Sequence, residues 1–434
     1  MDKKLVATIT VASILLLPLF SGCIQQNNIS NKKPIISIRY PSNNSVVHSI
    51  VMISGLAYDP DGEEDLTAVE IKINDEEWHT ADGTTQWSFE WNAYDYEDGT
   101  YTITARAWDG KEYSDTETIT LIVDNPDIVE SSSHKWAIFI AASNFPNDNE
   151  SKLGNGGLYL AEEMAEYLIE NCRYSTSNIF ILFDDGWIRN NNGYGKRVKT
   201  LQERSHKYNI IYGGATKKNV IHTINYVIKE SNKYRDSEIF LWIFNHGYGD
   251  KDNILTGGKI LEHSIIFTWD DTLSDKELGE LLGPLKSKKT CIIIDACYSG
   301  GFADKTILNL PTPLLLRSKI PQSGRIVITG ASKFRKGYTS TTEGPLFSQL
   351  WFKGLKTGEA DGFKPGILNI GRPTRLRIFK DGKVSVEEAF YYARYMLRTD
   401  ENIKQYKSMQ PQINDNYPQK GFLRSLGEMI LGED

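Results

Sequence analysis

The pattern of hydrophobic and polar residues changes twice along the chain. After an apolar run near the N-terminus, residues 34–123 alternate between apolar and polar positions in short stretches. From residue 134 onward, continuous apolar runs are separated by stretches with helical periodicity. Alternation predicts half-buried strands, whereas continuous apolar runs between helices predict parallel strands covered on both faces. We therefore expect two folded parts of different class, joined by a linker at 125–133.

The first part is predicted to be an all-β sandwich over residues 34–124. Turn sequences such as Asp59-Pro60-Asp61-Gly62 separate its short apolar stretches at roughly even spacing, which is typical of an antiparallel sandwich. The acidic turn lacks the spacing of an EF-hand loop, so we interpret it as a solvated turn rather than a calcium site. The predicted strands are Ile35 to Ile38, Val46 to Ile53, Ala68 to Ile73, Trp87 to Trp91, Tyr101 to Ala107 and Thr118 to Val123.

This segment resembles the immunoglobulin-like modules of exported microbial proteins. In those modules a D-P-D-G turn and a D-G-T-Y-T strand are frequent, and both occur here at 59–62 and 98–102. The chain has no Cys…Trp…Cys core, so an antibody-type domain is not expected. The resemblance implies an immunoglobulin-like domain that spaces the second part from a surface or binds a surface partner.

The second part, residues 134–434, is predicted to be an α/β fold with a mostly parallel sheet flanked by helices. Two segments carry little regular signal, 186–214 and 304–324, and we expect long functional or mobile loops there. Helices are predicted over Leu158 to Asn171, from the cap Thr216 to about Tyr234, and after the capping boxes that begin at Ser274 and Ser385. The predicted strands are Trp136 to Ala142, Ile179 to Phe183, Ile239 to Phe244, Cys291 to Ile294 and Arg325 to Thr329.

The N-terminal residues have the pattern of an export signal. Lys3-Lys4 precedes an apolar stretch from Leu5 to Phe20 that is short for a membrane span, and Ser21-Gly22-Cys23 follows it. This resembles a lipoprotein signal, which implies a signal peptide over 1–22, lipidation at Cys23 and a polar tether over 23–33. The alternative is an uncleaved N-terminal anchor helix. Both interpretations predict an exported protein held at the cell surface by its N-terminus.

Charge and cysteine content narrow the classes of ligand. The net charge of −7 provides no electrostatic basis for binding nucleic acid. The four cysteines include no C-x-x-C pair, so no zinc site is expected, and we predict no cofactor. Cys172 and Cys291 lie in apolar patterns and are interpreted as buried thiols, although a disulfide between them remains open.

Two apolar strands end in residues that can perform nucleophilic catalysis. Ile239 to Phe244 is followed by Asn245-His246-Gly247, and Cys291 to Ile294 by Asp295-Ala296-Cys297. In an open α/β sheet, ligands bind beyond the carboxyl ends of the strands, so the imidazole and the thiol can face one cleft. An imidazole can accept the proton of a cysteine nucleophile. The backbone N–H groups of Gly247 and Cys297 are candidate donors to an oxyanion.

Residues 134–434 resemble the legumain and caspase-like clan of cysteine peptidases on these motifs. The histidine precedes the cysteine, and D-A-C-x-S-G replaces the caspase Q-A-C-x-G signature, which favours the legumain-like branch. The resemblance implies a caspase-like α/β sandwich with Cys297 as nucleophile, His246 as general base and acid, and Gly247 as oxyanion donor. Asn144, after the first strand of this part, matches the asparagine that orients the histidine.

The substrate is expected to be a protein or peptide, with specificity left open. The Arg-His pair that follows the asparagine in legumains is missing from residues 153–158. Asp184-Asp185 and Asp270-Asp271 favour a basic residue before the scissile bond if one pair lies in the pocket. The sequence thus predicts a surface-anchored cysteine endopeptidase. The alternatives are a non-catalytic surface binding lipoprotein and a transamidase that uses the same dyad.

Overall fold

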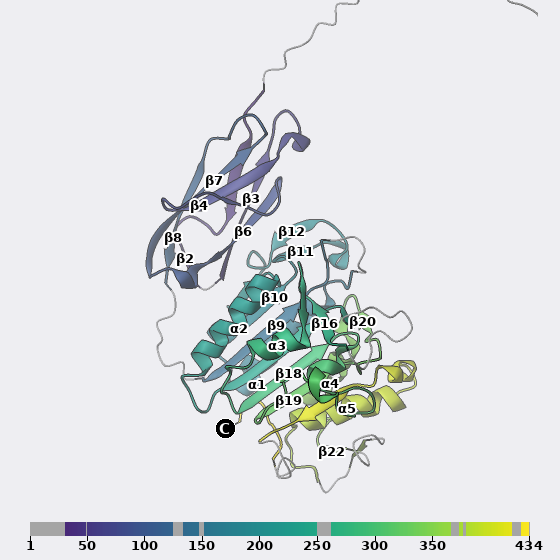
Figure 1. Ribbon diagram of the computed structural model, residues 1–434. Coiled ribbons are helices and arrows are strands. Elements are labelled where there is room, and N and C mark those ends of the chain that lie inside the picture. The colour runs from purple at the N-terminus through teal and green to yellow at the C-terminus, as the bar shows by residue number, and fades with distance from the viewer. Residues whose placement is uncertain are drawn as a thin grey trace, which may run out of the picture.

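The computed structural model describes residues 31–48, 50–124, 133–146, 152–249, 262–365, 373–375, 379–418 and 427–433. The signal sequence, Cys23 and most of the linker lie outside these residues. The described chain folds into a small β-sandwich and a larger α/β part, with the sandwich seated on one edge of the larger part (Figure 1).

The sandwich has two sheets whose inner faces share one core. One sheet has the order β1-β3-β6 and the other the order β2-β8-β7-β4-β5. The predicted alternation is confirmed, for example in β7, where Ile103, Ala105 and Ala107 are fully buried between half-exposed neighbours. The strands are β1 (Ile35–Tyr40), β2 (Ser45–Val47), β3 (Ile50–Tyr58), β4 (Ala68–Ile73), β5 (His79–Thr80), β6 (Gln86–Asn92), β7 (Gly99–Trp108) and β8 (Glu117–Val123).

The α/β part is built on a seven-stranded sheet of order β13-β10-β9-β14-β18-β19-β24. All neighbouring pairs are parallel except β19 and β24. The mostly parallel sheet is therefore confirmed, with one antiparallel edge strand. Its strands are β9 (Lys135–Ala141), β10 (Ile179–Phe183), β13 (Ile211–Gly213), β14 (Glu238–Phe244), β18 (Lys289–Asp295), β19 (Arg325–Thr329) and β24 (Gln412–Asp415).

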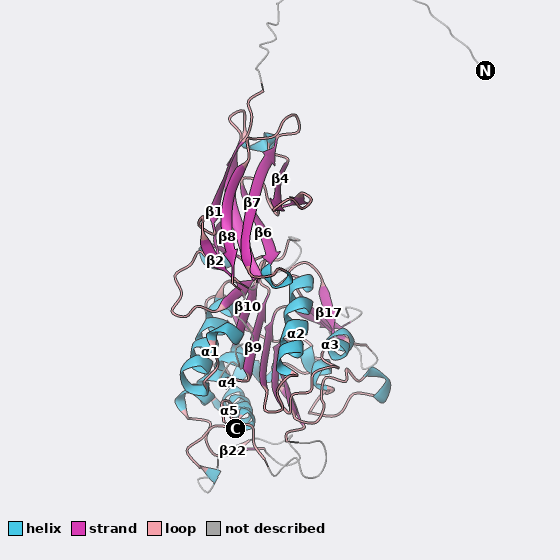
Figure 2. Cartoon of the chain, turned by 90° about the vertical axis from the view of Figure 1, so that its left-hand side faces the viewer, coloured by secondary structure: helices cyan, strands magenta, loops and turns pink. Residues whose placement is uncertain are grey.

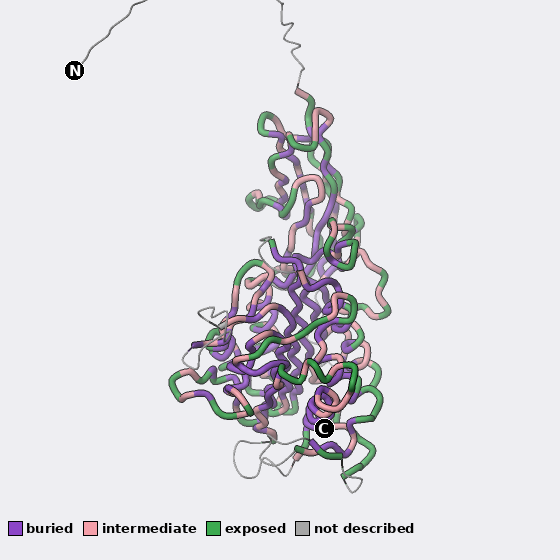
Figure 3. The backbone as a smooth tube through the Cα atoms, turned by 90° about the vertical axis from the view of Figure 1, so that its right-hand side faces the viewer, coloured by how far each residue is buried: buried purple, intermediate pink, exposed green. Residues whose placement is uncertain are grey.

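Helices cover both faces of this sheet. Side chains of α1, α4 and α5 pack in one apolar core with Phe139, Phe240 and Trp242, and those of α2 and α3 pack in a second core with Ile138, Leu241 and Ile292. Figure 2 shows the two groups on opposite sides of the strands, and Figure 3 shows the buried chain concentrated between them. The helices are α1 (Gly156–Cys172), α2 (Lys217–Ser231), α3 (Asp275–Leu281), α4 (Leu346–Thr357) and α5 (Val386–Thr399).

Of the two segments predicted as long loops, 304–324 contains one short 3-10 helix, Leu314–Leu316, and 186–214 contains short strands. Residues 186–214 form a hairpin of β11 (Trp187–Arg189) and β12 (Arg197–Thr200), followed by β13.

After β14, strands β15 (Gly247–Gly249), β16 (Ser264–Phe267) and β17 (Thr272–Ser274) form a small antiparallel sheet. Two pairs of two-residue strands complete the list: β20 (Thr339–Ser340) with β21 (Gly344–Pro345), and β22 (Phe363–Lys364) with β23 (Thr374–Arg375).

The sandwich docks on the β11–β12 hairpin and on β13. Trp187 Nε1 donates to Ser88 Oγ at 2.7 Å, and Arg197 pairs with Asp82 at 2.8 Å. The backbone N–H of Gly214 donates to a Glu90 carboxylate oxygen at 3.0 Å. The edge of the large sheet at β13 is thus covered by the other domain, which removes an exposed strand edge.

Candidate active site

His246 and Cys297 leave the sheet side by side because their strands are neighbours. β14 and β18 run parallel, and Phe244 is paired with Asp295 at the end of the ladder. His246 and Cys297 each follow that pair by two residues, so the two segments emerge at the same level. Both residues line one pocket of about 100 Å³. The predicted juxtaposition of the two strand ends is therefore found in the structure.

The pocket is mainly apolar and has one acidic residue among its described lining residues, Asp295. Segments far apart in the sequence build it, from the residues before α1 to the residues before α4. The lining residues are Leu153, Phe244, Asn245, His246, Asp295, Ala296, Cys297, Gly337, Tyr338, Thr339 and Pro345.

The Cys297 thiol is half-buried and lies against the backbone of Gly337. The Gly337 N–H donates to Sγ at 3.3 Å, and the Gly337 carbonyl oxygen lies 3.8 Å from Sγ. Burial raises the pKa of the Cys297 thiol, while the Gly337 N–H and the charge of Lys336 act in the opposite direction. The resting thiol is therefore protonated at neutral pH, and a base must remove its proton before it can attack.

Aromatic rings hold the His246 side chain in place. The Phe145 ring lies 5.4 Å from the imidazole between centroids, and the Phe267 ring meets it edge-on at 6.5 Å. Phe267 also donates its backbone N–H to the His246 carbonyl at 3.1 Å. The loop after β9 and strand β16 thus fix both the backbone and the ring of this residue.

Gly247 occupies a place where no side chain fits. A Cβ atom at this position would lie 2.1 Å from the carbonyl oxygen of Cys297. Gly247 lies opposite Ile266 in the β15–β16 ladder. The preceding residue, His246, accepts the hydrogen bond from Phe267 N. Because hydrogen-bonded and non-hydrogen-bonded pairs alternate in an antiparallel ladder, Gly247 and Ile266 form a non-hydrogen-bonded pair. The Gly247 N–H therefore points away from β16 and is not used in that ladder.

Asp295 is the site residue to which the sequence analysis assigned no role. It is buried, and one carboxylate oxygen accepts from Ser348 N at 2.9 Å and from Ser348 Oγ at 2.8 Å. Burial raises the pKa of Asp295 to about 6, although both Ser348 donors act to lower it. A signal was available, because Asp295 directly follows the predicted strand Cys291 to Ile294 and precedes Cys297 by two positions.

The acids predicted to set basic specificity lie elsewhere. Asp184 and Asp185 are buried and contact Arg189, and Asp185 also pairs with Arg197 at 2.5 Å. Asp270 and Asp271 both bind Lys217 at the start of α2. None of the four lines the pocket at Cys297. The interpretation that placed one of these pairs in that pocket is not supported, because each pair is engaged by basic or backbone groups of the chain itself.

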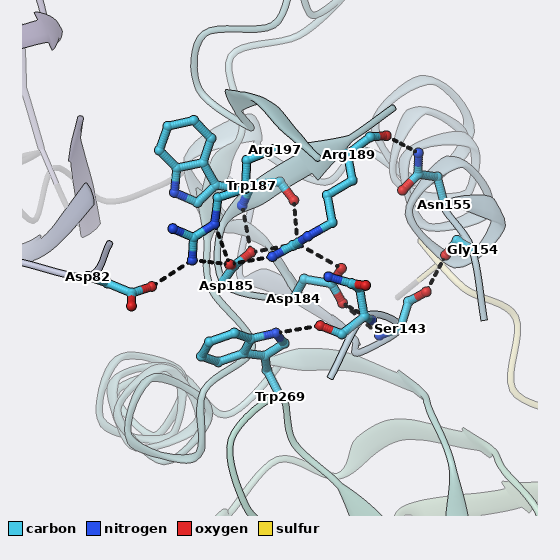
Figure 4. A network of polar contacts seen from close by, with 11 residues as sticks. Asp82, Ser143, Gly154, Asn155, Asp184, Asp185, Trp187, Arg189, Arg197 and Trp269 are labelled. Carbon is cyan, nitrogen blue, oxygen red and sulfur yellow. Dashed lines mark hydrogen bonds and ion pairs between the residues drawn. The ribbon is translucent and has the colours of Figure 1, made fainter. Parts of the chain in front are cut away.

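The buried pair of acids forms a network that reaches the loop after β9 (Figure 4). Burial would raise the pKa of Asp185, but hydrogen bonds and charges from Arg189 and Arg197 lower it. Burial raises the pKa of Asp184 to about 7. Asp184 Oδ1 accepts the N–H groups of Ser143 at 2.6 Å and Asn144 at 3.0 Å.

Asn144 lies beside the catalytic pocket rather than in it. Its carbonyl accepts from Trp269 Nε1 at 2.8 Å, and the residue forms part of the wall of a second cavity between the two domains. Its Oδ1 atom is buried without a hydrogen bond among the described residues, so it does not hold the imidazole of His246 in this conformation. The orienting role predicted for Asn144 stays a prediction.

Outside the pocket, the described residues contain two further thiols. Cys172 and Cys291 are buried and free, so the disulfide left open above is not formed, and burial raises the pKa of both thiols. Within the described residues, no cluster of three or more histidine, cysteine or acidic side chains could hold a metal ion. Over the same residues, no helix is both long and apolar enough to cross a bilayer.

Comparisons with known proteins identify the first domain. Residues 34–105 match the family model described as a bacterial Ig domain, which confirms an immunoglobulin-like domain at that place. No curated protein matches the sequence.

Solved structures similar to the chain include caspase-1 from Spodoptera frugiperda, with a TM-score of 0.35 and 10% identity over 65% of this chain and 86% of that chain. Fibronectin(III)-like modules of Clostridium thermocellum CbhA have a TM-score of 0.19 and 21% identity over 21% of this chain and 100% of theirs. An endo-beta-1,4-mannanase from Thermotoga petrophila has a TM-score of 0.20 and 13% identity over 22% of this chain, and the match spans 20% of the mannanase. These similarities are too distant to assign an activity.

Proposed function

We propose that the α/β part is a cysteine endopeptidase of the legumain and caspase-like type, with Cys297 as nucleophile and His246 as general base. The observation that carries this proposal is the exit of both residues from the paired ends of β14 and β18 into one pocket. The His-before-Cys order and the D-A-C-x-S-G motif support the same assignment.

The groups around Cys297 suit an acyl-transfer reaction. His246 takes the thiol proton, and Sγ attacks the carbonyl carbon of the scissile bond to form a tetrahedral oxyanion. The N–H groups of Gly247 and Cys297 stabilise that oxyanion. His246 then gives the proton to the leaving amine as the C–N bond breaks. Water hydrolyses the thioester, which releases the new carboxyl terminus and restores the thiol.

Asp295 supports the predicted preference for a basic residue before the scissile bond. With a pKa of about 6, its carboxyl group is mostly ionised at neutral pH. Apart from His246 and Cys297, the other residues that line the pocket are uncharged or apolar. An arginine or lysine side chain that enters this pocket would find one negative charge there.

Cleavage of a mixed peptide library tests the proposal. Wild-type protein should cleave, Cys297→Ala should not, and His246→Ala should lower kcat/KM by about 10³-fold or more. Cys172→Ala is the matched control, because it removes a thiol that is buried away from the pocket. Peptide cleavage that survives in Cys297→Ala contradicts the proposal. Transfer of the acyl group to an added amine would identify a transamidase instead of a hydrolase.

We also propose that the protein is exported and anchored at the surface through a lipid on Cys23. The lipoprotein-like sequence at 1–23 and the bacterial Ig domain, which is typical of surface proteins, support this placement. Incorporation of labelled fatty acid by cells that express the full chain should be lost in Cys23→Ser. Equal labelling of the wild type and Cys23→Ser would contradict lipidation at Cys23.

A further inference from the structure

A second cavity, of about 560 Å³, lies where the immunoglobulin-like domain meets the α/β part. Both domains contribute to its wall, with the turn before β6 on one side and the β9 loop and the β11–β12 hairpin on the other. We call it the interdomain groove. Its lining residues are Gly83, Thr84, Thr85, Gln86, Asn144, Phe145, Pro146, Lys152, Arg189, Gly195, Lys196, Arg197 and Trp269.

Two lysine side chains give the interdomain groove its available positive charge. The ammonium groups of Lys152 and Lys196 form no ion pair with any residue that the structure describes.

The two arginines of the interdomain groove have a different role. Arg189 and Arg197 are held by Asp184, Asp185 and Asp82 (Figure 4). They keep the hairpin, the β9 loop and the Ig domain in one arrangement. The positive charge that stays available to a ligand therefore comes from the two lysines.

Phe145 connects the interdomain groove to the catalytic pocket. It lines the groove, and its ring packs against His246 at 5.4 Å between centroids. The Phe145 ring therefore separates the groove from the imidazole of His246. An extended peptide advances about 3.3–3.6 Å per residue, so a few residues are enough to reach from the scissile bond into the groove.

We propose that the interdomain groove binds an acidic segment of the polypeptide substrate a few residues from the scissile bond. Lys152 and Lys196 would pair with the carboxylates of that segment. The Ig domain then forms part of the substrate-binding site. This inference rests on the peptidase function proposed above and adds to it the charge of the distal substrate residues.

Peptide substrates with a common cleavage site test the proposal on the full chain. One substrate is short, and the others extend it on either side by four residues that are glutamate-rich or lysine-rich. On one side of the cleavage site, either N-terminal or C-terminal, the extension should reach the groove. For that side, wild-type kcat/KM should be about ten-fold higher with the glutamate-rich peptide than with the lysine-rich peptide. Lys196→Glu should reduce this ratio at least about five-fold.

Matched variants separate a local effect from a change in overall charge. Lys199→Glu makes the same charge reversal in β12, on an exposed lysine outside the interdomain groove, and should keep the wild-type ratio. Thr84→Glu places a negative charge on the Ig side and should reduce the ratio, whereas Thr116→Glu, on an exposed Ig residue outside the groove, should not. Equal cleavage of the two extended peptides by the wild type, or equal effects of Lys196→Glu and Lys199→Glu, would overturn the proposal.

A binding experiment distinguishes failure of this proposal from failure of the peptidase assignment. Fluorescence anisotropy measures binding of the glutamate-rich peptide to Cys297→Ala, which cannot turn over. Binding that Lys196→Glu weakens and Lys199→Glu does not would support the interdomain groove even if no peptide is cleaved. Absence of binding would overturn the groove whether or not the short substrate is cleaved. Binding of a free glutamate-rich peptide that lacks the cleavage-site residues, with no effect on cleavage, would show a site unrelated to the substrate.

Discussion

Each residue at the proposed catalytic centre is held by contacts from a different part of the chain. His246 is held by Phe145 and Phe267, and the Cys297 thiol is held by the backbone of Gly337. His246, Gly247 and Cys297 could be proposed as site residues from the sequence because each follows a strong apolar strand. Gly337 could not, since its segment reaches the thiol only through the tertiary fold.

Gly247→Ala tests how closely the two strand ends must approach. Its Cβ would overlap the Cys297 carbonyl oxygen, so the backbone that carries the nucleophile has to move. A displacement of this size should lower kcat/KM by about 10²-fold or more. Gly279→Ala is the control, because its Cβ would also overlap a backbone carbonyl oxygen, that of Ser318, but away from the pocket, and it should have a much smaller effect on kcat/KM of the folded protein. Similar losses in the two variants would contradict this interpretation of Gly247.

Asp295→Asn tests the charge in the pocket and its effect on stability. The variant keeps an acceptor for Ser348 but removes the negative charge, so cleavage after arginine or lysine should fall by about ten-fold or more relative to cleavage after neutral residues. In the wild type, that preference should weaken as the pH falls through about 6, where the carboxyl group becomes protonated.

The same carboxyl group predicts a stability difference with a definite sign. Its pKa in the folded protein, about 6, lies above its ordinary value of 3.8. Its contribution to stability is therefore full below pH 3.8 and is lost as the pH rises through 6. Relative to Asp295→Asn, the wild type should lose free energy of unfolding between pH 4 and pH 7.5 in urea titrations. A constant difference across that range would show that the carboxyl group is not perturbed.

At the scale of elements, strongly patterned strands and helices could be predicted and short or polar ones could not. The capping boxes at Ser274 and Ser385 open α3 and α5 as expected. The edge strand β13 has three residues and β24 is polar, so tertiary pairing rather than local pattern makes them strands. Helix α4 was missed, and the predicted strand from Val46 to Ile53 is two strands that belong to different sheets.

The β11–β12 hairpin connects the Ig domain to the catalytic loop, and Arg197→Met tests that connection. The substitution leaves Asp185 with one arginine fewer and breaks the pair with Asp82, so the free energy of unfolding should fall by about 3 kcal/mol. It should also lower kcat/KM, because Asp184 and Asp185 support the loop that carries Phe145.

Arg204→Met is the control for this prediction. Arg204 forms a similarly buried ion pair with Glu162 but contacts neither the Ig domain nor the catalytic loop through it. It should lower stability without lowering kcat/KM of the folded protein. Chemical denaturation and steady-state kinetics on both variants make the comparison. An unchanged kcat/KM in Arg197→Met would mean that the hairpin does not support the active site.

At the scale of the whole molecule, docking of the two domains depends on a carboxyl group. Glu90 lies against the backbone of Gly213 and Gly214, and burial raises its pKa to about 7 from an ordinary 4.5, although the bond from Gly214 N lowers it. The contribution of this carboxyl group to the free energy of docking is greatest below pH 4.5 and is lost as the pH rises through 7. Proteolysis of the linker at 125–133 should be faster at pH 8.5 than at pH 6. Glu90→Gln should remove most of that difference, and an equal pH dependence in both proteins would contradict it.

The assignment of Cys297 as the nucleophile is tested most directly by mass spectrometry after brief reaction with iodoacetamide. The wild type should carry one alkyl group, on Cys297, and the extent of labelling should match the loss of peptide cleavage. Cys172 and Cys291 are buried thiols in the same chain and should stay unmodified. Labelling should slow in His246→Ala, which lacks the base. Full alkylation of Cys297 with peptide cleavage intact would contradict the account.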